Sequence, residues 1–540
     1  MVTLGITVAD QSEFETALNE AIEDRVASRI GAQDPTLWGP DAESEAAIRL
    51  SWVSLATASR PLIEQIIVLR DDIRSRGLDH VVLCGMGGSS LAPEVICQAA
   101  GVPLAVLDSS DPAMVRHALA DRLDTTVVVV SSKSGGTVET DSQRRAYEQA
   151  FREANIDPAE RIIVVTDPGS PLETEATEAG YRIFHADPAV GGRYSALTAF
   201  GLVPSGLAGV DIGGLLDDAE SAQDLLFADS VDNLALRLGV LMGVANRHQV
   251  DKLVLADRNG HGVGDWRNGH GVGDWIEQLI AESTGKLGRG VLPVVVPSED
   301  AVNFSPSSAD SILVSVGSTE PPTGESGWAA AVDGPLAAQM VAWEVATCVA
   351  GRLIGINPFD QPDVESAKQA ARDLLGSSST PPVPDAIDGD IELYGTAEST
   401  VSAAVAALLD EVDPAHGYVA IQAYLDRIDL ADFATVRESV AARTERPVTF
   451  GWGPRFLHST GQFHKGGTPN GVFVQITCEP ADDLTVPGRD FTFGSFIASQ
   501  AAGDAQVLRG HGRPVLRLHL ADIDALARVR DTLRSAQAGQ

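Results

Sequence analysis

Positive charge is scarce in this chain. Among its 540 residues, 39 are lysine or arginine and 75 are aspartate or glutamate, so the formal net charge at pH 7 is −36. A surface of that sign repels a phosphate backbone, which argues against nucleic acid as a partner. The acidic excess otherwise indicates a well-solvated surface and says nothing about chemistry.

Cysteines are few, and the longest apolar stretch is broken by charge. That stretch, Pro335 to Ile356, contains Glu344 and Arg352, which predicts a buried helix and not a membrane span. The amino terminus lacks the charged start and apolar run of a secretory signal. The cysteines have no metal-ligand spacing, which favours a reducing compartment; they are Cys84, Cys97, Cys348 and Cys478. We therefore expect a cytoplasmic protein.

Short β-branched runs alternate with helical stretches along most of the chain. The first series lies at 81–84, 103–108, 127–132 and 161–167, and the second at 252–257, 291–296, 311–317, 418–425 and 472–477. Continuous apolar strands separated by helices indicate parallel sheets that are covered on both faces. The sequence therefore predicts an α/β fold with two doubly wound parallel-sheet domains and peripheral helices.

The length of the chain also favours two large domains. We expect a helical segment at 1–45, a first α/β domain at 46–210, and a second α/β domain with the later helices at 211–540. The Ser- and Pro-rich segment Ser377 to Asp385 is interpreted as a surface connection inside the second domain.

One segment is repeated in tandem. The sequence RNGHGVGDW occurs at 258–266 and again at 267–275. Its glycines predict an exposed loop between the 252–257 strand and the next helix, where an insertion is tolerated. A metal site at His261 and His270 is the less favoured interpretation, and the role of the repeat stays open.

Two polar loops follow predicted strands. GMGGSS at 85–90 combines glycines, which allow close backbone approach, with the start of a helix. SSKSGGTVET at 131–140 places hydroxyls and glycines at the carboxyl end of a strand. Neither a Walker loop nor a dinucleotide fingerprint is present, so a small phosphorylated metabolite is the expected ligand. The candidate contacts are Gly88, Ser89, Ser132, Lys133, Ser134, Thr137 and Thr140.

These loops resemble those of the sugar isomerase (SIS) fold, in which a serine- and threonine-rich turn holds a sugar's phosphate. Four further segments resemble signatures of the glucose-6-phosphate isomerase family: VGGRYS at 190–195, QLIAESTGK at 278–286, NPFDQPDVESAK at 357–368 and LHSTGQ at 457–462. The resemblance covers about 80–520 in separate blocks. It implies reversible interconversion of glucose 6-phosphate and fructose 6-phosphate through a cis-enediol intermediate, in glycolysis and gluconeogenesis. It also implies SIS-type domains, no cofactor or metal, and a homodimer.

The resemblance assigns the proton transfer to Glu282, which takes the proton from C2 and delivers it to C1. Gln278, four residues earlier on the same helical face, matches a substrate-contacting glutamine. Arg193 matches the arginine that stabilises the enediolate, a role that suits a permanently charged donor fork. Gly192 and Gln361 match further ligand-contacting positions.

Ring opening is assigned by the same resemblance to Lys368 and His458. The LHSTGQ segment follows the FDQP segment here, whereas it precedes it in the best-known members; this order resembles the subgroup whose isomerase domain is fused to transaldolase. His464 is therefore a competing candidate for ring opening, and Glu365 is the alternative base. Asp363 departs from the familiar glycine and is tolerable in a first helical turn.

Two other functions stay open. A non-catalytic SIS-fold sensor of sugar phosphates needs only the two polar loops, because a fold does not fix a function. A bifunctional transaldolase/glucose-6-phosphate isomerase needs an additional eight-stranded barrel of about 250 residues, for which this chain leaves no room beside two α/β domains. Activity on mannose 6-phosphate is not decided by the sequence.

Overall fold

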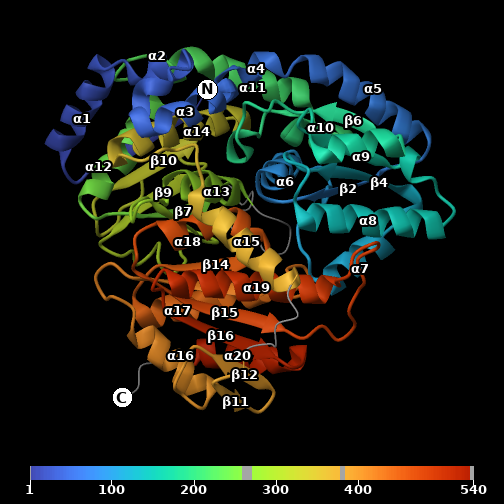
Figure 1. Cartoon of the computed structure of the whole chain (residues 1–540). Coiled ribbons are helices and arrows are strands. Elements are labelled where there is room, and N and C mark those ends of the chain that lie inside the picture. Colours follow the sequence, from blue (N-terminus) through green and yellow to red (C-terminus); the bar gives the residue numbers. More distant parts are fainter. Residues whose placement is uncertain (1, 258–270, 377–382, 536–540) are drawn as a thin grey trace.

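The computed structural model describes residues 2–257, 271–376 and 383–535, without the side chains at 257, 364, 365, 367 and 368. Its named strands form three sheets that occupy different parts of the molecule (Figure 1). Most strand pairs are parallel and helices pack on the sheets, which confirms the predicted α/β fold class. The runs predicted at 252–257 and 418–425 belong to different sheets.

The first sheet has the strand order β3-β2-β4-β5-β6 and is parallel throughout. Its interior strands β2 and β4 are buried along their whole length, as their β-branched runs predict. Its elements are β2 (His80–Gly85), α6 (Leu91–Ala99), β3 (Ala105–Leu107), α7 (Pro112–Ala120), β4 (Thr126–Ser131), α8 (Val138–Glu153), β5 (Ile162–Thr166), α9 (Pro171–Ala179), β6 (Arg182–His185) and α10 (Ala199–Ala208).

The second sheet has the order β1-β10-β9-β7-β8. The buried helix predicted from the longest apolar stretch is α14, which packs against α12 and α11. No helix within the described ranges is long and apolar enough to cross a membrane. The elements are α11 (Ile212–Leu226), α12 (Leu234–Arg247), β7 (Lys252–Asp257), α13 (Val272–Thr284), β8 (Leu292–Val295), β9 (Ser311–Val316), β10 (Ala329–Asp333) and α14 (Leu336–Ile354).

The amino-terminal segment corrects one expectation, because it is not helical throughout. Residues Thr3–Thr7 form β1, which pairs antiparallel with β10, more than 300 residues further along the chain. A five-residue Thr-Leu-Gly-Ile-Thr run becomes a strand only where an edge is available, and the sequence does not show that edge. The helices that follow lie over the outside of the first two sheets (Figure 1); they are α1 (Gln11–Glu23), α2 (Val26–Gly31), α3 (Pro40–Arg49), α4 (Leu55–Ala58) and α5 (Pro61–Ser75).

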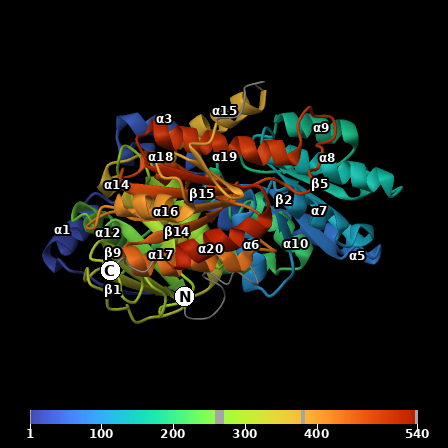
Figure 2. The ribbon, with the colours of Figure 1, turned by 90° about the horizontal axis from the view of Figure 1, so that it is seen from below.

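The third sheet has the order β11-β12-β16-β15-β13-β14. Helix α19 lies on one face, and α17 and α20 lie on the other (Figure 2). Helix α15 (Pro362–Gly376) leads into it and begins at Pro362, as predicted. Its elements are β11 (Ala386–Asp388), β12 (Ile391–Tyr394), α16 (Val401–Asp410), β13 (Tyr418–Tyr424), α17 (Val436–Thr444), β14 (Val448–Trp452), α18 (Gly461–Gly466), β15 (Gly471–Cys478), α19 (Phe493–Gly510), β16 (Val515–Leu520) and α20 (Leu526–Arg534).

The tandem repeat is described only at its end. Residues 258–270, which include His261 and His270, lie outside the described residues, as does most of the predicted connection at 377–385. In the second copy, Gly271 is the N-cap of α13 and Val272 to Trp275 form its first turn. This part of the repeat is therefore helix and not loop, and Trp275 is buried.

Candidate active site

Helix α13 is the element around which the predicted site residues gather. Gln278 and Glu282 are buried on one face, with 2% and 5% of their surface exposed. The Gln278 amide nitrogen is 3.5 Å from Glu282 Oε2. A carboxylate in such a setting loses hydration, so neighbouring charges act on it more strongly than they would in water.

Arg193 supplies the charge beside this carboxylate. Its Nη1 lies 3.6 Å from Glu282 Oε2, and its Nε donates to the Ser283 hydroxyl over 2.8 Å. The guanidinium also donates to the Gln361 side chain and to the carbonyl oxygens of Pro358 and Asp360. Arg193 is 3% exposed. These bonds fix the guanidinium between α13 and the segment before α15, so the positive charge is held in place before any ligand arrives.

His458 reaches the same place from the third sheet. Its carbonyl oxygen accepts a 2.8 Å hydrogen bond from Gln278 Nε2, and its imidazole Nε2 lies 3.1 Å from Glu139 Oε1. Gln500 of α19 donates to the same Glu139 oxygen. Glu139 was not among the residues predicted for the site, although it stands in the TVET part of the polar loop. Its partner His458 is 319 positions away.

His464, the competing candidate for ring opening, lies in the core. Its ring is stacked on Tyr418 with centroids 5.7 Å apart, and Nδ1 lies 3.0 Å from the Tyr418 hydroxyl. Burial and the neighbouring Lys465 and Arg513 hold the pKa of His464 well below its usual range. It packs as a neutral aromatic group, and His458 is the histidine that contacts Gln278.

The unusual chain order of two motifs is compensated in space. Gln462 of the LHSTGQ segment accepts from the Asp363 backbone N–H over 3.0 Å, and its Nε2 donates to Asp363 Oδ2 over 2.6 Å. Gln462 also donates to the carbonyl of Gly285, at the end of α13. Asp363, the departure from the familiar glycine, is therefore a structural link between α15 and α18.

The loop after β4 presents hydroxyl groups at the start of α8. Thr137 is the N-cap but makes no side-chain cap bond, and its hydroxyl is 3.2 Å from that of Ser132. Thr140 is 1% exposed, and its hydroxyl has no hydrogen-bond partner among the described residues. Ser134 is exposed and accepts from Gly136 N–H. Unused hydroxyls at a helix N-terminus suit an anionic group.

Lys133 is bonded within the protein. Its Nζ forms a 2.6 Å ion pair with Asp167 and donates to the carbonyl of Pro188. The side chain therefore links the polar loop to the end of β5 and to the segment that precedes Arg193.

The two glycines of the neighbouring turns contact each other. A Cβ atom at Gly88 would lie 2.0 Å from the carbonyl oxygen of Gly192. The loop after β2 and the turn that carries Arg193 thus pack backbone against backbone, which a larger residue prevents. Ser89 lies beside them at intermediate exposure. The glycine content of both motifs has a packing reason in addition to any contact with a ligand.

Lys286 lies in the site region but was not predicted from the sequence, whereas the side chain of the predicted Lys368 lies outside the described residues. Lys286, at the end of the QLIAESTGK segment, is buried and pairs with Asp360 over 2.7 Å. Burial and Arg193 lower its pKa to about 7. Lys368 and Glu365 lie within α15, but their side chains lie outside the described residues.

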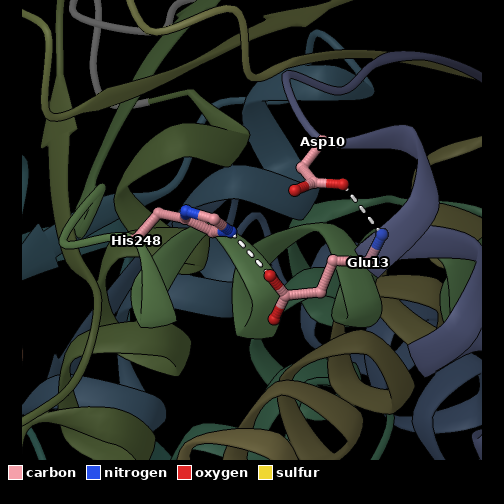
Figure 3. A group of neighbouring side chains, drawn as sticks. All are labelled: Asp10, Glu13 and His248. Carbon is pink, nitrogen blue, oxygen red and sulfur yellow. Dashed lines mark hydrogen bonds and ion pairs between the residues drawn. The ribbon is translucent and has the colours of Figure 1, made fainter.

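Within the described residues, groups of His, Asp and Glu side chains that could hold a metal ion occur twice, and one of them consists of His117, Asp426 and Asp429. Asp10, Glu13 and His248 come together at the outer surface between α1 and the end of α12 (Figure 3). Asp10 caps α1 by accepting from Glu13 N–H, and Glu13 pairs with His248 over 2.8 Å and with Arg247. These interactions account for the positions of all three side chains.

The fold and the site define a class: an α/β protein with a buried glutamate–arginine pair and a hydroxyl-lined loop at the start of a helix. Residues 69–286 match the model of the phosphoglucose isomerase family. The matched stretch contains the polar loops, Arg193, Gln278 and Glu282, whereas Gln361, Lys368 and His458 lie beyond it.

Curated relatives with this activity in their names are similar to the chain. The chain is 33% identical over 221 residues to a probable glucose-6-phosphate isomerase of Haloarcula marismortui, which covers 40% of this chain and 49% of the relative. It is 32% identical over 315 residues to a glucose-6-phosphate isomerase of Synechococcus elongatus, with 56% and 57% covered. The chain thus spans about half the length of the curated relatives that it matches.

Two solved structures share the fold. A hypothetical protein of Thermus thermophilus superposes with a TM-score of 0.56 at 24% identity, covering 69% of this chain and all of that one. A glucose-6-phosphate isomerase of Chlamydia trachomatis gives a TM-score of 0.54 at 19% identity, with 70% and 89% covered.

Proposed function

We propose that this protein is an aldose–ketose isomerase that interconverts glucose 6-phosphate and fructose 6-phosphate, as the curated relatives' names state for them. The observation that carries the proposal is the buried Glu282–Arg193 pair, 3.6 Å apart, with Gln278 and His458 beside it. A carboxylate next to a fixed positive charge suits removal of a proton from carbon, because the charge that leaves the base develops on the substrate near the guanidinium.

The proposed reaction begins with the substrate's phosphate on the hydroxyls of Ser132, Thr137 and Thr140, with Ser134, Ser89 and the loop amides around it. His458, held by Glu139, gives a proton to the ring oxygen as the C1–O5 bond breaks, and Lys368 is proposed to take the proton from the C1 hydroxyl. Glu282 then accepts the C2 proton, the C2–H electron pair forms the C1=C2 bond of the enediolate, and the C1=O π pair moves onto O1. A proton passes from O2 to O1, and Glu282 returns its proton to C1 as the C2=O bond forms. Arg193, Gln278 and Gln361 orient the enediolate oxygens. Lys133 is proposed to hold the loop in place.

The sensor is the second candidate, since the hydroxyl-lined loop alone binds a sugar phosphate. The two candidates are separated by an assay that couples glucose 6-phosphate formed from fructose 6-phosphate to its oxidation by a dehydrogenase, with a metal chelator present. We expect turnover. Binding without turnover overturns the enzyme and supports the sensor, and turnover lost only on chelation overturns the metal-free route.

The proposal also covers the oligomeric state, the cellular compartment and the domain boundaries of the enzyme. We propose a homodimer in the cytoplasm, and analytical ultracentrifugation tests the dimer. The boundaries near residues 45 and 210 are proposed as the limits of the first α/β domain, to be tested by limited proteolysis.

A further inference from the structure

Two adjacent residues of α13 bind two adjacent residues of the third-sheet region. Gln278 Nε2 donates to the carbonyl of His458 over 2.8 Å, and the Ser459 hydroxyl donates to Glu277 Oε1 over 3.1 Å. Neighbouring helix positions point about 100° apart, so the His458–Ser459 peptide is held from two directions. The same helix carries Glu282 one turn further on.

Ser459 lies at a turning point of the chain. It follows the short helix Arg455–His458 and precedes α18, and its own φ and ψ are −140° and −92°, outside both regular conformations. The backbone of Ser459 therefore directs the chain from the short helix that carries His458 into α18. The imidazole of His458 is fixed at its far end by Glu139, 3.1 Å away.

Glu277 faces away from Glu282, into a pocket behind α13. The two carboxyls are five positions apart, or about 140° around the helix. The pocket is lined by residues of α13, α17, β14 and the short helix Arg455–His458. The charged groups that face Glu277 are Asp274 of α13, Arg437 of α17, and Arg455 of the short helix before His458.

The balance of these groups favours the neutral acid. Burial and the Asp274 carboxylate raise the pKa of Glu277 to about 8, against the opposing effect of Ser459 and the two arginines. At neutral pH the carboxyl thus accepts the Ser459 hydrogen bond without carrying a full buried charge, and the bond is retained.

We propose that Glu277 and Ser459 are positioning residues, which hold the His458 imidazole at the ring oxygen of the substrate through the Ser459–Glu277 hydrogen bond. This inference rests on the proposed function. It makes α13 the common support of the proton-transfer base and of the ring-opening histidine.

The test isolates ring opening from isomerisation. In a Glu282→Gln background the C2 proton is not transferred, but ring opening and reclosure still exchange the α and β anomers of glucose 6-phosphate, which magnetisation-transfer NMR measures. Ser459→Ala and Glu277→Met are each added to this background. Each variant loses the Ser459–Glu277 hydrogen bond, and we expect this loss to slow anomer exchange about 2- to 10-fold while substrate affinity stays unchanged.

Three further variants make the result specific. Glu277→Gln keeps an acceptor for Ser459 and is expected to restore the exchange rate to within about twofold of the background. The double variant Glu277→Met/Ser459→Ala is expected to be no slower than the slower single variant, because both remove the same bond. Ser221→Ala, which removes an exposed hydroxyl bonded only within α11, is the control and leaves the rate unchanged.

Anomer exchange at the background rate in both Ser459→Ala and Glu277→Met overturns the inference, and so do additive losses in the double variant. Failure of Glu277→Gln to restore the rate also overturns it. If the wild-type chain has no isomerase activity, the proposed function fails, and this inference fails with it. If the wild type is active and the variants are unaffected, only this inference fails.

Discussion

Two regions of the molecule contribute to the site in different ways. The stretch at 69–286, which matches the phosphoglucose isomerase family, carries the polar loops, Arg193 and Glu282. The region after it carries Gln361 and His458 and is connected through bonds such as Gln278 to His458 and Gln462 to Gly285. The comparison teaches that the groups proposed for proton transfer lie within one family-matched stretch, whereas His458, proposed for ring opening, joins them through tertiary contacts.

A second set of contacts holds these regions together. Arg427 and Arg455, from the third-sheet region, share the buried carboxylates of Glu94 and Asp108 in the first. Removal of one member of such a buried network leaves an uncompensated charge, so the network specifies how the regions meet. The geometry between His458 and Glu139 depends on that docking.

The largest expected effect is in the proton-transfer region. Glu282→Gln keeps the shape of the side chain but removes the base. We expect kcat and kcat/KM to fall together by about 10²- to 10⁴-fold, and exchange of the C2 proton with solvent to disappear. Steady-state kinetics and NMR in deuterium oxide measure both. Retention of more than about a tenth of wild-type kcat would show that another residue is the base, and Glu365 is the next to test.

The matching change in the later region is expected to cost less. His458→Ala removes the ring-opening acid, but sugar rings also open slowly in water, so we expect a loss at the low end of the about 10²- to 10⁴-fold range. Isomerisation and anomer exchange are expected to fall together, unlike in Glu282→Gln. His464→Gln is the comparison variant. Because His464 is a core residue, we expect this change to lower the Tm while the rate of ring opening changes little. Loss of ring opening without loss of stability in His464→Gln would show that His464, and not His458, is the ring-opening acid.

A third change tests whether the polar loop binds the phosphate. Thr137→Val removes a hydroxyl that is not used to cap α8. Since a phosphate contact holds substrate and transition state alike, we expect KM to rise about tenfold with kcat little changed. Ser54→Ala, at an exposed hydroxyl with only a local bond, serves as the control. A fall in kcat at constant KM would remove this loop from the phosphate site.

Particular residues show how far the sequence could lead. The β-branched runs located β2, β4, β7 and β13, because continuous apolar runs are distinctive. The Ala-rich β10 was not located, and the division of strands between sheets depends on pairing that periodicity does not report. Motif matches identified Glu282 and Arg193 as site residues, and the structure places their side chains next to each other.

The carboxylates that support His458 and Ser459 could not be predicted from the sequence, for a related reason. Glu139 and Glu277 are two of 75 acidic residues, and neither has a local signal that distinguishes it. Their partners, His458 and Ser459, are 319 and 182 positions away. Only the folded arrangement shows which carboxyls support a histidine and which ones are solvated.

A smaller effect is expected from the pocket behind α13. The folded-state pKa of Glu277 is about 8 and its ordinary value is 4.5, so the folded protein binds the extra proton between them. The free energy of unfolding therefore loses this contribution as pH rises through that window. Glu277→Gln removes this pH dependence of stability. The Tm of the variant minus that of the wild type is therefore expected to increase by about 1–3 °C between pH 5 and pH 8. Glu153→Gln, at an exposed position near the end of α8, is the control. A Tm difference between Glu277→Gln and the wild type that stays constant with pH contradicts the assignment.

The smallest expected effect concerns the junction that leads into α13. Because the repeat is a perfect tandem, deletion of 258–266 or of 267–275 gives the same chain, in which RNGHGVGDW still precedes Ile276. The retained copy places a tryptophan and an aspartate at the positions of Trp275, which is buried, and Asp274, which lies 3.7 Å from Arg455. The first turn of α13 is thereby rebuilt with the same residues, and only the length of the connection from β7 changes.

Shortening a connection changes its closure entropy slowly, so we expect kcat within about twofold of the wild type and a Tm within about 2 °C. Deletion of 263–275 is the contrasting variant, because it removes both copies of the VGDW turn; it should lower the Tm and kcat, since the helix loses the buried Trp275 contact. Loss of activity in the nine-residue deletion, with a native circular dichroism spectrum, would give the duplication a function of its own. The proton-transfer region would then depend on a segment beyond the family's signature motifs.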